Sequence, residues 1–421
     1  MPSPWRNPDF LKLWAGQTAS EAGTLVGRFA LPLVAVLTLN ASPVEMGLLR
    51  TADILPAIVF SLFAGVWVDR LRRRPILIGV DLGRALLLAT IPLAALLGTL
   101  RIEWLYAVGV GVGVLTIVFE VAYRSYLPSL VSRDALVEAN ARLSATSAVV
   151  EVGSFSLAGA LVQALTAPVA ILVDAASFLA SCASLVLIRH REAAPHPEGA
   201  SHRVWAEMGE GLGVVVRHPI LRPLAVAQGT RQLFTQMWVA LLYLFLTRDL
   251  KLEPVLFGML FAIGGASSFV GALAVERLVE RFGFGRTFAV AFGVSSASLL
   301  LVPLASGPPL LAAAMVGSQQ VFDAAGTIAE IGERTLLQSL TPGRLLGRVT
   351  AGLQLVSWTA LLVGSLVGGL LGEMIGVRQT MLVAAVGALP SVWWLIASPI
   401  GALRRITPSS TSERPARQGL D

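Results

Sequence analysis

The most constraining feature of the sequence is a short charged segment between two long apolar runs. Residues 65–74 read G-V-W-V-D-R-L-R-R-R and join the run 44–68 to the run 76–97. Each run is longer than the roughly 20 residues that a helix needs to cross a lipid bilayer. Because five charges packed between two such runs must stay outside the hydrocarbon, the junction predicts a polytopic membrane protein.

The composition agrees with this class and excludes a soluble globular core. Hydrophobic residues make up 55% of the chain and charged residues 14%, whereas soluble domains carry about 25% charged residues. The formal net charge is +6, but the basic residues lie in short loops between apolar runs and form no continuous polar face. We therefore expect the lipid bilayer as a partner and no nucleic acid.

Apolar segments of membrane-spanning length recur twelve times along the chain. They are predicted at 10–38, 45–69, 75–98, 103–127, 143–166, 168–189, 221–246, 254–276, 286–305, 308–332, 350–373 and 378–402. The fold class expected is an all-α polytopic membrane protein with twelve transmembrane helices. We divide it into a six-helix bundle at 1–189, a cytoplasmic central loop at 190–219, a second six-helix bundle at 220–402 and a cytoplasmic tail at 403–421.

Charge placement predicts the orientation in the membrane. With the N-terminus inside, 22 of the 32 lysines and arginines fall in cytoplasmic segments and only 4 in outer loops. This bias predicts that both termini are cytoplasmic. Arginine greatly outnumbers lysine, which is typical of a high-GC bacterial gene, so we expect a multi-pass protein of the bacterial inner (cytoplasmic) membrane.

The two halves of the sequence repeat each other. S-P-V-E-M-G-L-L at 42–49 recurs as E-P-V-L-F-G-M-L at 253–260, and E-V-A-Y-R-S-Y-L-P-S-L at 120–130 recurs as E-I-G-E-R-T-L-L-Q-S-L at 330–340. V-D-R-L-R-R-R at 68–74 likewise matches V-E-R-L-V-E-R at 275–281, and the offsets of the three pairs are 211, 210 and 207 residues. Nearly constant offsets indicate a duplicated six-helix unit, as in many transporters.

The charged junction also matches a family motif, G-x-x-x-D-R-x-G-R-R. The matching residues are Gly65, Asp69, Arg70, Arg73 and Arg74, with Arg72 in place of the second glycine. Further matches are F-L-K-L-W-A-G-Q-T-A-S at 10–20, L-V-S-R-D-A-L-V-E-A-N-A at 130–141 and D-A-A-S-F-L at 174–179. On these segments the chain resembles the major facilitator superfamily over essentially its whole length. It is most similar to the drug and siderophore exporter branch, which includes macrolide-efflux and enterobactin-exporter proteins.

This resemblance implies a monomeric secondary active transporter that exports amphiphilic small molecules by proton antiport and alternating access. The chain lacks a nucleotide-binding P-loop and a G-x-S-x-G elbow, so we expect no enzyme activity and no cofactor, with a small molecule and protons as partners. Two departures leave an alternative open. Ser154 and Phe155 stand where drug antiporters often carry Gly-Pro, and residues 102–119 lack the arginine of many proton antiporters. The alternative is proton-coupled or facilitated uptake or transfer of a specific solute or lysolipid.

Polar and charged residues inside the spans mark the candidate sites, because a charge in mid-bilayer costs roughly 2.5–3.5 kcal/mol and must face protein or water. The substrate-cavity candidates are Gln17, Arg28, Gln228, Arg231, Gln232, Trp238, Gln320 and Trp358. The proton-coupling candidates are Asp323, which has no cation within one turn on its own helix, then Glu21 and Glu151. No metal site is expected, because the four histidines are irregularly spaced in the central loop.

A second set of residues is expected to serve gating or packing. The gating candidates are Gly65, Asp69, Arg70, Arg73, Arg74, Glu120, Arg124, Glu330 and Arg334. Asp69 is expected to act as a latch that holds the cytoplasmic gate closed in one state of the transport cycle. Arg72 to Arg74 are expected to fix the membrane topology from the water phase. Glu120 with Arg124 and Glu330 with Arg334 are each expected to form an ion pair one helical turn apart. Arg50 with Asp53 and Asp81 with Arg84 are expected to neutralise each other within one helix, and Asp174 to pack.

Overall fold

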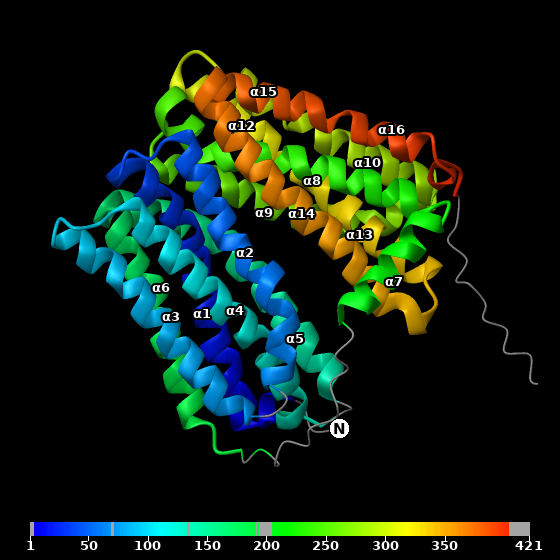
Figure 1. Cartoon of the computed structure of the whole chain (residues 1–421). Helices are drawn as coiled ribbons and strands as arrows, with labels where there is room; N and C mark the ends of the chain where they lie inside the picture. Colours follow the sequence, from blue (N-terminus) through cyan, green and yellow to red (C-terminus); the bar gives the residue numbers. More distant parts are fainter. Residues whose placement is uncertain (1–3, 69–70, 133–134, 191, 193–203, 404–421) are drawn as a thin grey trace, which may run out of the picture.

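The computed structural model describes residues 4–68, 71–132, 135–190, 192 and 204–403, and this part of the chain contains helices but no β-strand (Figure 1). Asp69 and Arg70 of the charged junction and residues 404–421 lie outside the described residues.

The helices follow the predicted spans closely. The first group comprises η1 (Pro4–Arg6), α1 (Pro8–Leu33), the π-helical turn η2 (Val34–Thr38), α2 (Pro43–Val68), α3 (Arg73–Leu96), α4 (Ile102–Leu130), α5 (Leu136–Leu165) and α6 (Ala167–Leu187). Then come α7 (Val204–Arg217), α8 (Leu221–Leu244), the π-helical turn η4 (Phe245–Asp249), α9 (Pro254–Phe282), α10 (Phe284–Ser298) and α11 (Leu301–Leu304). The chain ends with α12 (Pro309–Val321), α13 (Asp323–Leu340), α14 (Gly343–Ile375), α15 (Val377–Ala388), α16 (Pro390–Ile396) and η5 (Pro399–Ala402).

Proline and asparagine set where several helices begin. Pro8, Pro43, Pro254 and Pro309 occupy the first helical position, where proline's missing N–H would have had no partner in any case. Asn7 caps α1, because its side-chain oxygen accepts hydrogen bonds from the backbone N–H groups of Asp9 and Phe10. These local signals explain why the observed starts lie within a few residues of the apolar boundaries.

Nine of the described helical segments are long and apolar enough to cross a membrane. The other predicted spans correspond to α2, to α8 and to the pair α12 and α13. The tenth predicted span, 308–332, corresponds to two helices, because the helix breaks at Phe322 and restarts at Asp323. The break places an acidic side chain in the first turn of α13.

The sequence duplication is also visible in the backbone. The π-helical turns η2 and η4 start 211 residues apart, at Val34 and Phe245. Asn40 and Lys251, also 211 residues apart, have nearly the same positive φ, 53° and 52°. Thr166 and Gly376, 210 residues apart, match in the same way with φ of 89° and 91°. The two halves therefore share unusual backbone conformations at equivalent positions, as a duplicated unit requires.

The helices α1–α6 and α8–α16 form two groups that touch near one end of the molecule. We call this end, which holds Asn40 and Lys251, the closed face, and the end that holds η1 and α7 the terminal face. At the closed face, Arg248 donates to the Ala41 carbonyl at 2.9 Å and Gln163 donates to Glu253 at 2.9 Å. Away from it the two groups diverge toward the terminal face (Figure 1).

An aromatic cluster fills the space between the two groups on the inner side of the closed face. Phe29 and Phe155 from the first group meet Tyr243, Phe257 and Phe261 from the second, with ring centroids 5.5–6.3 Å apart. Such aromatic pairs add to the apolar burial. Phe29 and Phe257 are 0% exposed, so the two groups of helices are closely packed on this side.

Candidate functional site

The larger cavity lies within the second group of helices and has a volume of about 670 Å³. Its wall is mostly polar and comes from α8, α9, α10, α12, α13 and α14. The polar residues that line it are Gln228, Arg231, Gln232, Thr235, Ser268, Ser295, Ser296, Gln319, Asp323, Thr327, Glu330, Glu333, Arg334, Thr350, Gln354 and Ser357. The structure thus brings together several of the predicted site residues from two helices that are distant in sequence.

Asp323 reaches this cavity from the break between α12 and α13. Its Oδ1 accepts a hydrogen bond from Gln319 Nε2 at 3.1 Å, and no ion pair to it is formed among the described residues. Gly264 of α9 gives the carboxylate room, since a Cβ there would lie 2.8 Å from Asp323 Oδ2. An acid held by one neutral amide beside a cavity is free to bind either a cation or a proton.

Arg231 and Glu333 form the other charged part of the same cavity. The Arg231 guanidinium carbon lies 4.7 Å from the centroid of the Phe292 ring, and its Nε has no hydrogen-bond partner among the described residues. Glu333 and Glu330 both lie close enough to Arg231 to attract it electrostatically. Sequence reasoning missed Glu333, although its spacing of three residues from Glu330 places both acids on one helical face.

A smaller cavity of about 350 Å³ lies within the first group of helices. Glu21, Gln17 and Arg28 line it from α1, as predicted for cavity residues, and Glu120 lines it from α4. Glu21 accepts a hydrogen bond from the Ser147 hydroxyl at 2.7 Å. This partner on α5 fixes the Glu21 carboxylate in the cavity wall.

Four candidates point elsewhere, and the structure gives the reason for each. Trp238 is only 4% exposed and its indole donates to the Leu299 carbonyl at 3.1 Å, so it packs in the core. Gln320 is also buried, with its amide directed at the Leu260 carbonyl. Trp358 is half-buried and Glu151 is exposed on α5, and neither lines the two cavities described above.

The predicted ion pairs form only in part. Glu330 pairs with Arg334, both of them largely exposed, and Arg50 pairs with Asp53 at 2.9 Å. Asp81 pairs with Arg84, and this pair is almost completely buried. The Glu120–Arg124 pair is absent from the described residues: both side chains are exposed and make no ion pair with each other.

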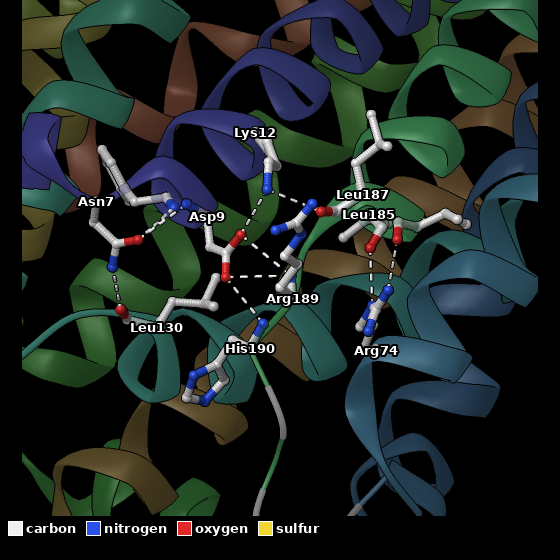
Figure 2. Close-up of polar contacts among 11 residues, drawn as sticks. Asn7, Asp9, Lys12, Arg74, Leu130, Leu185, Leu187, Arg189 and His190 are labelled. Atoms are coloured by element: carbon white, nitrogen blue, oxygen red, sulfur yellow. Dashed lines mark hydrogen bonds and ion pairs between the residues drawn. The ribbon is translucent and has the colours of Figure 1, made fainter.

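The charged junction is bound to the end of α6 at the terminal face. Arg74 Nε donates to the Leu185 carbonyl at 2.9 Å and its Nη2 to the Val186 carbonyl at 2.7 Å (Figure 2). The backbone N–H groups of Arg73 and Arg74 both donate to the Glu192 carboxylate at 3.1 Å. The expectation that Arg72, Arg73 and Arg74 act from the water phase is therefore wrong for two of them. Arg74 caps the α6 carbonyls, and the partly buried Arg73 places its Nη1 3.8 Å from Glu192 Oε1. Gly65, the first residue of the charged junction, lies within α2.

Asp9 makes the matching attachment between α1 and the end of α6. Its carboxylate accepts hydrogen bonds from the backbone N–H groups of Arg189 and His190 and from Lys12 Nζ (Figure 2). Lys12 Nζ also donates to the Leu187 carbonyl at 2.9 Å. Together with Arg74, these contacts tie α1, α3 and α6 into one unit at the terminal face.

The described part of the central region offers a helix cap and no metal site. His218 Nδ1 accepts hydrogen bonds from the backbone N–H groups of Ile220 and Leu221, each at 3.2 Å. Burial lowers the pKa of His218 from its ordinary value. Among the described residues no group of three histidine, cysteine, aspartate or glutamate side chains is arranged to hold a metal ion.

Comparison with known proteins gives a family match over almost the whole chain. The model of the family described as transmembrane secretion effectors matches residues 2–417. The multidrug efflux pump Tap of Mycolicibacterium fortuitum is 28% identical over 395 residues, which cover 90% of this chain and 92% of Tap.

Solved structures show the same fold. A bacterial homologue of the iron transporter ferroportin in its inward-facing state matches with a TM-score of 0.75 and 17% identity, covering 92% of this chain and 98% of that one. The outward-facing state of a protein with the same description matches at the same coverage with 19% identity, but with a TM-score of only 0.57. The helix arrangement described above is therefore closer to the inward-facing structure.

Proposed function

The chain belongs to the family of transmembrane secretion effectors, within the major facilitator superfamily, and we propose that it exports cationic amphiphilic small molecules in exchange for protons. The family consists of transporters and not of enzymes. Tap, a multidrug efflux pump, is similar over nine-tenths of the chain. This similarity supports export of amphiphilic compounds, such as drugs or siderophore-like molecules, as the direction and substrate class.

The observation that carries the proposal is the unpaired acid in the larger cavity. Asp323 faces a volume of about 670 Å³, and within the described ranges its one hydrogen-bond partner is the Gln319 amide. The cavity wall holds three acids, Asp323, Glu330 and Glu333, against two arginines, Arg231 and Arg334. This excess of one negative charge favours a cationic substrate, because a positive ligand neutralises it.

Proton exchange follows from competition for the same carboxylate. Ionised Asp323 attracts a cation, and protonated Asp323 releases it, so the two ligands exclude each other. When Asp323 binds a proton on the side of the membrane where the proton concentration is higher, the substrate is released on that side. Glu330 and Glu333 are two further acids of the same cavity, and Arg231 attracts Glu333 electrostatically.

The direction of export depends on the orientation in the membrane. We propose that the protein is a monomer of the bacterial cytoplasmic membrane with its terminal face in the cytoplasm, as the distribution of arginine indicates. The cavities then open toward the cytoplasm, and the contacts at the closed face block the outside. In this state a cytoplasmic substrate reaches Asp323, and alternating access requires the closed face to open next.

Gradient-driven transport in proteoliposomes tests the proposal, with ethidium as the fluorescent cation and an imposed pH gradient. We expect the wild-type protein to move ethidium against the flow of protons. Asp323→Asn is expected to remove most of the gradient-driven movement of ethidium and to leave a slower exchange of ethidium without a gradient, because the neutral amide binds no proton and attracts the cation less. Asp53→Asn is the control, since Asp53 is half exposed and already paired with Arg50.

Three results would contradict the proposal. Movement of ethidium in the same direction as protons would show symport. Full gradient-driven antiport by Asp323→Asn would exclude Asp323 from the coupling mechanism. A loss of folded protein in Asp323→Asn with normal coupling in the surviving fraction would assign it a structural role.

A further inference from the structure

A second group of acids lies behind the smaller cavity, in the first group of helices. Asp81 and Arg84 of α3 and Asp174 of α6 are 0%, 4% and 5% exposed. Arg84 also contributes to the wall of the smaller cavity. Three charged side chains with this degree of burial are costly unless their charges balance.

The position of Arg84 is fixed on both sides. Its guanidinium carbon lies 4.3 Å from the centroid of the Phe119 ring and 4.0 Å from that of Phe178. The two rings sandwich the guanidinium, as expected for cation–π contacts, and its Nη2 pairs with Asp81 Oδ1. Arg84 thus lies between the two acids and the water of the cavity.

The charges in this cluster do not balance. Two carboxylates face one guanidinium, which leaves one negative charge if both acids are ionised. Within the described structure, Asp174 Oδ1, Asp81 Oδ2 and Arg84 Nε also lack any hydrogen-bond partner. A single proton shared by the two acids removes the excess charge and supplies an O–H donor where oxygens lack one.

The charged and titratable neighbours on the surrounding helices leave this balance unchanged. Arg28 of α1 attracts Asp174 and Glu120 of α4 attracts Arg84, but both side chains are exposed at the cavity wall, where water screens them, and they are opposite in sign. Cys182 of α6 lies near Asp81 as a neutral thiol. The buried excess charge is therefore left to the two acids and Arg84.

Asp174 is the acid through which the cluster contacts a cavity-lining helix. Gly27 of α1 packs directly on the Asp174 carboxylate, and a Cβ at position 27 would overlap Oδ2. The hydroxyl of Thr24, also on α1, approaches the same carboxylate. A change in the charge of Asp174 therefore alters its contacts with α1, the helix that places Glu21 and Arg28 in the cavity wall.

We propose that Asp81 and Asp174 share one exchangeable proton, which makes this cluster a second proton-coupling site in the half of the molecule opposite Asp323. On release, the O–H bond of the protonated carboxyl breaks, the proton passes to cavity water, and Arg84 then pairs with two carboxylates. On uptake, the reverse step returns Arg84 to Asp81 alone. The coupling role rests on the proton antiport proposed above, whereas the shared proton does not.

Infrared spectroscopy tests the shared proton without any transport. At neutral pH, Asp174→Asn and Asp81→Asn are each expected to remove one protonated carboxyl band and to leave the carboxylate bands unchanged, because the remaining acid pairs with Arg84. Asp53→Asn, the control, is expected to remove a carboxylate band instead. Loss of a carboxylate band in either cluster variant would show that the proton is not shared between the two acids and would overturn the proposal. The two variants are independent, so a failure of one to fold leaves the other as the test.

Transport in ethidium-loaded proteoliposomes tests the coupling role. We expect Asp174→Asn to lower gradient-driven transport by about tenfold or more, a coupling free energy within the usual range, while exchange without a gradient continues. A structural role would instead lower the yield of folded protein and leave the ratio of driven transport to exchange at the wild-type value, which would overturn the coupling role. If the wild-type protein shows no proton-driven transport, the proposed antiport fails, and the infrared result alone decides the shared proton.

Discussion

Replacing Gly159 by alanine is expected to destabilise the closed face selectively. Gly159 of α5 lies against α9, and a Cβ at this position would lie 2.6 Å from the Pro254 carbonyl oxygen, 3.0 Å from Val255 Cα and 3.1 Å from Gly258 Cα. All three are backbone atoms of α9, so no side-chain rotation relieves the overlap. The helices must separate, which opens the closed face.

The magnitude follows from the cost of overpacking. An added methyl group in a well-packed contact costs about 1–3 kcal/mol. The cost arises only where α5 and α9 touch, so it lowers the ratio of inward-facing to outward-facing molecules by roughly 5- to 150-fold. The higher helix propensity of alanine stabilises both states alike and cancels.

Distance measurement by electron spin resonance reports this ratio directly. Spin labels at Leu97→Cys and Leu310→Cys, in a Cys182→Ser background, place one probe on each group of helices at the closed face, where the native side chains are 68% and 83% exposed. Gly159→Ala is expected to shift the distribution toward the longer separation. Gly153→Ala is the matched control on the same helix, because a Cβ there would lie in open space, with no packing atom within 4 Å. An unchanged distribution in folded Gly159→Ala, or an equal shift in the control, would refute the reasoning.

Two further predictions concern the terminal face. Arg74→Gln should destabilise the protein by about 1–3 kcal/mol, because the charged hydrogen bonds to the α6 carbonyls are lost. Arg72→Gln is the control, since the Arg72 side chain is exposed and its loss should leave the stability unchanged. Equal thermal stability of the two variants would contradict this prediction. Burial lowers the pKa of His218 below the ordinary 6.5, so on acidification the unfolded chain binds a proton before the folded chain does. The cap made by neutral His218 therefore stabilises the fold fully above pH 6.5, and this stabilisation is lost as the pH falls below 6.5. Amide hydrogen exchange at Ile220 and Leu221, corrected for intrinsic rates, should therefore accelerate on acidification, and His218→Gln should abolish that pH dependence.

The helices were predictable because their signals are local. The length of each apolar run, with proline at the first helical position of α1, α2, α9 and α12, defines where a span begins with little help from tertiary structure. The break between α12 and α13 was not predictable in this way. The residues Val321, Phe322 and Asp323 include neither proline nor glycine, so the break has no signal in the sequence.

The cavity residues were predictable only in part, because the rotation of each helix about its axis decides where a side chain points. Gln232 and Trp238 are both mid-span on α8, yet Gln232 faces the cavity and Trp238 donates to the Leu299 carbonyl. Asp174 was expected to pack, and it does contact α1 closely. The missing hydrogen-bond partner of its Oδ1 depends on how three helices pack together, so no single segment of the sequence reveals it.

The closed face preserves the symmetry of the duplication. Gly47 of α2 meets Gly369 of α14, and Gly258 of α9 meets Gly159 of α5; a Cβ on any of the four would come within 3.2 Å of the partner's Cα. Gly47 and Gly258 are 211 residues apart, and Gly159 and Gly369 are 210 apart. The two contacts are thus copies of each other, so the same substitution at either one should open the face by a similar amount, as expected for two halves that rock about a central axis.

The charged residues have lost that symmetry. At the 210-residue offset of their spans, Asp323 corresponds to Gly113 and Asp174 corresponds to Ala384. Each half therefore keeps an acid that the other half lacks, while the glycine contacts that allow the halves to move are shared. If both acids exchange protons, Asp323→Asn and Asp174→Asn should each remove part of the coupling, and the double variant should retain exchange but lose all dependence on the proton gradient. A double variant no worse than Asp323→Asn alone would show that the duplicated fold uses only one of its two halves for coupling.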